Sequence, residues 1–212
     1  MPSSQLVAIF PAARALARTA HAKDDATFEH GSRMIEASAA ICDALGCDAT
    51  TVEQLKIAAL LHDVGKCTVP DTILFKPGRL DAVEIQVMAD HSASGHNLLA
   101  GVGHPWFDLA ADVALMHHER HDGSGYPRGL AGDAIPVMAR IIAVADVYDA
   151  LRADRPYKKG ITHDEAMQVM TRGDERTRPG HFHPDVMAAF AARSETIRRI
   201  YVEHDNQLGW DG

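Results

Sequence analysis

Histidine and aspartate side chains recur at the ends and on the inner faces of the helices that the sequence predicts. The chain contains 13 histidines, and neutral imidazole is the commonest transition-metal ligand in proteins. Two adjacent pairs, His62–Asp63 and His117–His118, close predicted helices, and the single His30 and His91 lie inside others. Asp146 and Asp149 are three residues apart and therefore share one helix face.

Helical bundles build metal sites from side chains that face one another on different helices. A lone inward histidine is more often a hydrogen-bonded core residue than a ligand, but here metal-capable groups recur on several helices. Burying so many ionisable groups without partners is costly, and a cation removes that cost. The pattern favours a metal site. We expect the remaining histidines to be ordinary, namely His96, His104, His163, His181, His183 and His204.

Helical spacing of apolar residues runs through almost the whole chain. Capping boxes at Thr50–Glu53, Asp81–Glu84 and Thr162–Glu165 predict three helix starts, the second helix continuing to about Ala100. Further helices are expected along the stripe from His30 to Leu45, over 106–118 and 136–151, and from Pro184 through Tyr201. No segment has the alternation of a strand between turn residues. The sequence therefore predicts an all-α fold, with two longer loops at 66–79 and 119–135.

Composition excludes several classes of protein. Of the 212 residues, 46% are hydrophobic and 24% charged, a globular balance. The net charge of −8 argues against DNA binding, and no apolar run is long enough to span a membrane. Cys42, Cys47 and Cys67 cannot all pair, and we expect reduced thiols in a cytoplasmic protein.

Several segments in order resemble one known family. His62–Lys66 looks like the HD-type phosphohydrolase signature, and His117–Pro127 is similar, almost letter for letter, to the second signature of the HD-GYP family. The segments Lys76–Gly78, Ala145–Leu151 and Arg155–Tyr157 also resemble the family pattern. The likeness covers roughly 21–190, so we expect an N-terminal helical lead over 1–20 and an HD-GYP-like phosphohydrolase domain over 21–212.

The resemblance implies an HD-type helical bundle with a metal site between its core helices. It also implies a cytoplasmic bacterial phosphodiesterase that acts on cyclic di-GMP with two divalent ions. Mixed imidazole and carboxylate ligands suit iron or manganese, with zinc as an alternative. The implied ligands of the first ion are His30, His62, Asp63 and Asp146. Those of the second are His91, His117 and His118, with Asp63 bridging.

The implied reaction is attack of a metal-bridging hydroxide on the phosphodiester, giving linear pGpG and, with a second cleavage, GMP. Asp63 and Lys66 are the expected catalytic residues. Lys66, Arg155 and Lys158 are expected to bind the substrate, and Asp149 is expected to orient a ligand histidine. The GYP loop contributes Asp122, Gly123, Gly125, Tyr126 and Pro127.

The sequence departs from the family pattern in four places. Ala26 stands where some members have a glutamate ligand, so we expect two metal ions rather than three. His121 replaces an aromatic residue, where it is close enough to the ligand doublet to perturb the site, and His183 replaces an aspartate. The segment Arg172–His181 is longer and more basic than expected, and either tunes substrate access or is a surface loop.

Two other functions remain open. Related HD hydrolases cleave other nucleotides, and a fold does not fix a substrate. Members of the family can also act as non-catalytic interaction modules that respond to cyclic dinucleotides. The partner would be a diguanylate cyclase or a separate regulatory protein, bound through the surface around Glu119–Arg128. The segment 1–22 would form a helix that either packs on the domain or makes a homodimer.

Overall fold

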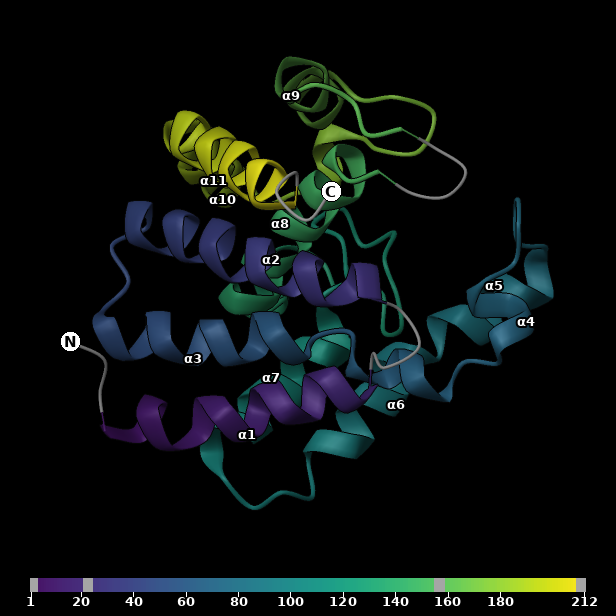
Figure 1. The fold of residues 1–212 in the computed structure, drawn as a ribbon. Helices are drawn as coiled ribbons and strands as arrows, with labels where there is room; N and C mark the ends of the chain where they lie inside the picture. The colour runs from purple at the N-terminus through teal and green to yellow at the C-terminus, as the bar shows by residue number, and fades with distance from the viewer. Residues whose placement is uncertain (1–3, 21–24, 155–158, 209–212) are drawn as a thin grey trace.

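The computed structural model describes residues 4–20, 25–154 and 159–208, and within these ranges the chain is helical without a strand (Figure 1). The predicted all-α fold is confirmed. The α-helices are α1 Ser4–Ala20, α2 Asp25–Ala44, α3 Ala49–Leu61, α4 Asp71–Leu74, α5 Ala82–Ala89, α6 His91–Leu99, α7 Pro105–Met116, α8 Val137–Arg152, α9 His163–Arg172, α10 Pro184–Ala192 and α11 Ser194–Leu208. Short 3₁₀ turns are η1 Val64–Thr68, η2 Gly132–Ala134 and η3 Pro179–His181. Among the described helices, none combines the length and apolar character that crossing a membrane requires.

The predicted helix starts are confirmed at two of three positions. The capping boxes of Asp81 with Glu84 and of Thr162 with Glu165 both form. The third start was wrong, because Asp48 caps α3 by accepting a hydrogen bond from the Thr51 amide at 2.7 Å. Two helices expected to be continuous are each divided in two, between α5 and α6 and between α10 and α11.

The core lies around α2 and α3, which run side by side (Figure 1). Helix α2 also packs against α8, α10 and α11, while α7 packs against α3 and α6. The largest fully buried side chains include Met34, Ile41, Leu55, Ile142, Tyr148 and Phe190. One compact apolar interior therefore holds the ends of α3, α6 and α7 near the middle of α2 and α8.

Helix α1 packs on α3 and buries the side chains of Ala13 and Ala17. The N-terminal segment thus contributes to the same core, which favours packing over dimerisation for its apolar face. The boundary between residues 20 and 21 stays a prediction. Helices α4 and α5 project from the body of the molecule and bury no residue (Figure 1).

The expectation of reduced thiols was wrong for two of the three cysteines. Cys42 and Cys47 form a disulfide, with their Cα atoms 5.4 Å apart. Helix α2 ends between them, and Gly46 in the left-handed region turns the chain so that the Cys47 amide bonds the Cys42 carbonyl at 3.1 Å. Cys67 is exposed and free.

A close backbone approach fixes α6 against the end of α3. A Cβ atom on Gly65 would lie 2.0 Å from the carbonyl oxygen of His91 and 2.5 Å from the backbone nitrogen of Gly95. Only glycine fits at this position, where η1 meets α6. The contact sets the separation between Asp63, just before η1, and His91, at the start of α6.

We expect Gly65→Ala to lower the free energy of unfolding by about 3 kcal/mol, because the methyl group must displace backbone rather than a flexible side chain. Urea unfolding followed by circular dichroism measures the change. Gly101→Ala is the matched control, since a Cβ there meets no atom within 4 Å. Equal unfolding midpoints for the two variants would contradict this account of the packing.

Candidate metal centre

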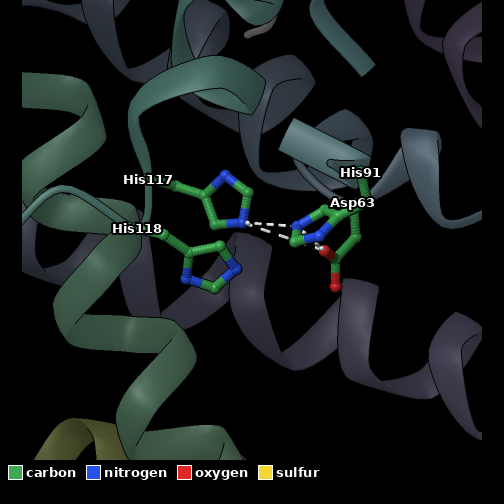
Figure 2. A group of neighbouring side chains, drawn as sticks. All are labelled: Asp63, His91, His117 and His118. Carbon is green, nitrogen blue, oxygen red and sulfur yellow. Dashed lines mark hydrogen bonds and ion pairs between the residues drawn. The ribbon is translucent and has the colours of Figure 1, made fainter. Parts of the chain in front are cut away.

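All seven predicted ligand side chains come together in two neighbouring groups. The first contains Asp63, His91, His117 and His118, and the second contains His30, His62 and Asp146. Within each group, one nitrogen or oxygen atom per residue lies within 4.8 Å of all the others. Figure 2 shows the first group, with the Asp63 carboxylate and the three imidazoles facing one another. The structure thus brings together every residue that was predicted to bind metal.

These side chains are delivered by five α-helices. His30 lies in α2 and Asp146 in α8. His62 and Asp63 directly follow α3, and His117 with His118 directly follows α7. His91 is the first residue of α6. Residues far apart in the sequence therefore meet because helix ends and two mid-helix faces converge on one point.

Asp63 stands between the two groups. Its Oδ2 atom is 3.4 Å from Nε2 of His62, and its Oδ1 atom is 3.3 Å from Nε2 of His91 and 3.8 Å from Nε2 of His117. In the second group, Nε2 of His30 is 3.7 Å from Oδ1 of Asp146. One carboxylate oxygen of Asp63 faces each group, which is the arrangement expected of a bridging ligand.

The histidine rings are oriented so that Nε2 is free to coordinate. Three rings direct Nδ1 at a backbone carbonyl, which can only accept a hydrogen bond, so Nδ1 carries the proton. These bonds run from His62 to Ala59 O at 2.7 Å, from His91 to Met88 O at 2.7 Å and from His117 to Ala114 O at 2.9 Å. The unprotonated Nε2 atoms of His91 and His117 are then 3.4 Å apart. Such a second hydrogen bond is usual for histidines that bind metal.

Burial and charge set the protonation of the site. Burial lowers the pKa of His117 well below its ordinary value and that of His118 to about 4, so both rings are neutral. Burial opposes the charge on His62, but the carboxylates of Asp63 and Asp146 outweigh it and raise the His62 pKa. Burial likewise opposes charge on Asp63, yet Lys66 and His62 hold the pKa of this carboxyl well below its usual range.

The donors fit a divalent cation. Asp63 is 3% exposed, and among the described residues its Oδ1 atom has no hydrogen-bond partner. A buried, ionised oxygen without a partner is costly, and a cation between it and the neighbouring Nε2 atoms removes that cost. Lys66 already neutralises the other side of the carboxylate, with Nζ 2.5 Å from Oδ2.

Asp149 contacts a candidate ligand without joining either group. Its Oδ2 atom accepts a hydrogen bond from Nδ1 of His30 at 2.6 Å, and Arg33 donates to both carboxylate oxygens at 2.7 and 3.2 Å. The expected orienting role of Asp149 agrees with this contact. Arg33 was missed, although it follows His30 by three residues on the same helix face.

The GYP loop is held from inside by Glu119. This carboxylate is 3% exposed and accepts hydrogen bonds from the amides of Arg128 at 2.7 Å and Leu130 at 2.9 Å. The interaction surface expected around Glu119–Arg128 therefore cannot include Glu119 itself. The loop also requires glycine at 125, where a Cβ would lie 2.4 Å from the backbone nitrogen of Arg120.

A pocket of about 90 Å³ opens beside the two groups. His118, Asp146 and Tyr126 are among the residues that line it, and the Tyr126 ring packs on that of His118 with centroids 4.8 Å apart. Burial raises the pKa of Tyr126, so the phenol keeps its proton. His181, expected to be ordinary, also lines this pocket.

The predicted GYP-loop residues Asp122 and Pro127 are exposed. Gly123 of the same loop has a φ angle of +79°.

His121 and His183, the two histidines that depart from the family pattern, pack on each other and belong to neither ligand group. The ring of His121 meets that of His183 edge to face, with centroids 4.9 Å apart, and His183 Nε2 is 3.3 Å from an Asp133 oxygen. Neither belongs to the two groups, so the expected perturbation by His121 finds no support in the geometry. Arg155 and Lys158 lie outside the described residues, as does the side chain of Ala26 in α2.

Comparisons with known proteins agree with this arrangement. Residues 14–179 match the HD domain family. A relative, the cyclic di-GMP phosphodiesterase response regulator RpfG of Xanthomonas campestris, is 45% identical over 155 residues, which are 73% of this chain and 41% of the relative.

Two solved structures have the same fold. An HDG"Y"P protein of Bdellovibrio bacteriovorus superposes with a TM-score of 0.61 and 19% identity, over 78% of this chain and 51% of the other. A cyclic GMP-AMP-specific phosphodiesterase of Vibrio cholerae gives a TM-score of 0.54 and 31% identity, over 92% of this chain and 42% of the other. This chain thus spans between 41% and 51% of these proteins.

An all-helical bundle with histidine and aspartate groups between its core helices defines the HD class of domain. The chain belongs to the HD domain family. Within it, the predicted HD-GYP resemblance is confirmed.

We expect Asp149→Asn to weaken cation binding at the group of His30, His62 and Asp146 by about 10- to 100-fold, because the neutral amide holds the His30 ring less firmly. The other group should keep its affinity. Titration of metal-free protein with Mn²⁺, with free Mn²⁺ counted by electron paramagnetic resonance, measures both sites.

Asp133→Asn is the matched control, since Asp133 is exposed, pairs with an arginine and belongs to neither group. Urea unfolding of each variant separates lost cation affinity from lost folding, because Asp149→Asn also leaves Arg33 with a weaker partner. Equal weakening of both cation sites, or unchanged binding at both, would contradict the orienting role of Asp149.

Proposed function

We propose that this domain is a metal-dependent phosphodiesterase that hydrolyses cyclic di-GMP to linear pGpG. The observation that carries the proposal is the position of Asp63, with one oxygen toward each histidine group. The Xanthomonas relative is named a cyclic di-GMP phosphodiesterase, which supports the substrate. A second cleavage of the linear product would give GMP.

We propose two divalent cations, iron or manganese, with zinc as the alternative. Asp63 would bridge them. The other ligands of one ion would be His30, His62 and Asp146, and those of the other ion would be His91, His117 and His118. When bound, two such ions lower the pKa of water enough to supply a nucleophile at neutral pH and stabilise negative charge on phosphoryl oxygens. With no glutamate at position 26, two ions rather than three are expected.

The side chains of the domain position the substrate around that centre. In this proposal the ammonium of Lys66, now paired with Asp63, donates to the phosphate that is cleaved. Tyr126 keeps its phenol proton and offers its ring and hydroxyl as one wall of the pocket. Arg155 and Lys158 remain proposed substrate contacts on the strength of the family resemblance.

The proposal is tested with protein purified without oxygen and loaded with Mn²⁺ or Fe²⁺. Chromatography should show cyclic di-GMP converted to pGpG, and a chelator should abolish the conversion. Asp63→Asn should lower kcat by at least about 10³-fold, because both cation sites lose their shared charged ligand. Elemental analysis should find two ions per chain in the wild type.

Asp90→Asn is the control for loss of a carboxylate near the same helices. Asp90 is exposed between α5 and α6 and belongs to neither group. Hydrolysis that survives chelation, or full activity in the Asp63→Asn variant, would defeat the proposal.

A second candidate substrate is 3′3′-cyclic GMP-AMP. The Vibrio cholerae structure, 31% identical over 92% of this chain, carries that specificity in its name. The metal chemistry would be the same, so a panel of both cyclic dinucleotides and a nucleoside monophosphate decides the substrate. A non-catalytic module with a diguanylate cyclase partner is less favoured, since all seven ligand side chains converge.

A further inference from the structure

We propose that Arg176, in the loop between α9 and η3, binds the phosphate of the cyclic dinucleotide that is not being cleaved. This inference rests on the proposed function, because it needs a substrate with two phosphates. It assigns a role to the segment Arg172–His181, which the sequence analysis left either to tune substrate access or to be a surface loop. The relevant surface is the part of the pocket lined by Arg176, Thr177, His181 and Phe182.

Arg176 is exposed and lines the same pocket as His118 and Asp146, one residue from each proposed metal group. In this proposal a substrate whose scissile phosphate lies beside His118 and Asp146 places its second phosphate near Arg176 within the same pocket. Arg120 also lines the pocket and is half-buried. Among the described residues, neither arginine forms an ion pair, whereas Arg33, Arg140, Arg193 and Arg198 do.

The loop that carries Arg176 is held in shape by its own hydrogen bonds. Asp174 Oδ1 accepts from the amides of Arg176 at 2.8 Å and Thr177 at 2.6 Å, and the Asp174 amide donates to the Thr177 carbonyl at 2.8 Å. Thr177 is 8% exposed, and Phe182 beyond η3 is 5% exposed. Anchored at both points, the backbone that carries Arg176 is already ordered, so only the exposed side chain has to be ordered on binding.

Charge explains why an arginine is useful here. The chain carries a net charge of −8, which opposes an anionic substrate. Bound cations would offset the negative charge of the phosphate that is cleaved. They would not offset the charge of the second phosphate, which in this proposal lies near Arg176. Guanidinium matches the paired oxygens of a phosphate with two parallel hydrogen bonds, which a lysine cannot do.

The experiment compares Arg176→Gln with Arg178→Gln in the metal-loaded domain. Arg178 is a matched control because it is an exposed arginine of the same loop that does not line the pocket. Steady-state kcat and KM are measured for cyclic di-GMP and for bis(p-nitrophenyl) phosphate, a diester with one phosphate. Isothermal titration measures binding of cyclic di-GMP independently of turnover.

Arg176→Gln should raise KM for cyclic di-GMP and weaken its binding by at least about tenfold, because two charge-assisted hydrogen bonds to the phosphate are lost or weakened. The change in kcat should stay within about twofold, and bis(p-nitrophenyl) phosphate should be cleaved as before. Arg178→Gln should leave every value unchanged. Arg176→Lys should recover part of the loss, since a point charge replaces the paired bonds.

Three results would overturn the inference. Equal losses for Arg176→Gln and Arg178→Gln would show a general effect of loop charge. An equal loss with bis(p-nitrophenyl) phosphate would place Arg176 on the cleaved phosphate. A loss with cyclic di-GMP but not with 3′3′-cyclic GMP-AMP, which has the same two phosphates, would place it on the guanine edge.

The proposed function can fail separately. If the wild type binds cyclic di-GMP without hydrolysing it, and Arg176→Gln alone weakens that binding, the inference stands while the phosphodiesterase proposal falls. If the wild type neither binds nor hydrolyses cyclic di-GMP, both fall.

Discussion

The arrangement of the site depends on one buried carboxylate. Asp63 is 3% exposed and remains ionised, because Lys66 and the neighbouring imidazoles offset the cost of removing its charge from water. Its place is fixed by the end of α3 on one side and by the contact of Gly65 with α6 on the other. If the backbones of Gly65 and α6 were further apart, the two groups of ligands could not share the carboxylate of Asp63.

Helix ends do more than carry the histidines to the centre. The last carbonyls of a helix lack partners within the helix, and three ligand candidates each bond the carbonyl three residues earlier. His62 and His117 thereby satisfy a terminal carbonyl of α3 and of α7, while His91 adds a bond to the Met88 carbonyl of α5, which the Asp90 amide also contacts. All three rings have their tautomer fixed by these bonds. His30 lies inside α2, where carbonyls are already bonded, so its Nδ1 needs the distant carboxylate of Asp149. The break between α5 and α6 supplies the carbonyl that His91 uses.

The sequence predicted what local chemistry determines. Adjacent pairs at helix ends identified the candidate ligands, and the capping boxes of Asp81 and Thr162 identified two helix starts. Contacts between distant segments could not be predicted from the sequence. Arg33 reaches Asp149 across 116 positions of sequence, and Glu119 binds loop amides that no periodicity links to it. The disulfide of α2 was missed because its formation depends on the turn geometry after the helix, which spacing alone does not give.

His121 and His183, the two histidines that depart from the family pattern, show how long-range contacts determine which residue suits a position. His183, where the family resemblance implies an aspartate, directs Nε2 at the carboxylate of Asp133, which also pairs with Arg140. An aspartate at 183 would place two carboxylates side by side, which is unfavourable, so imidazole suits this neighbour better. His121 then packs edge to face on His183, as one aromatic ring on another. The departures at 121 and 183 are therefore one structural change, made by two residues that do not line the pocket, and they leave the ligands of the proposed metal centre in place.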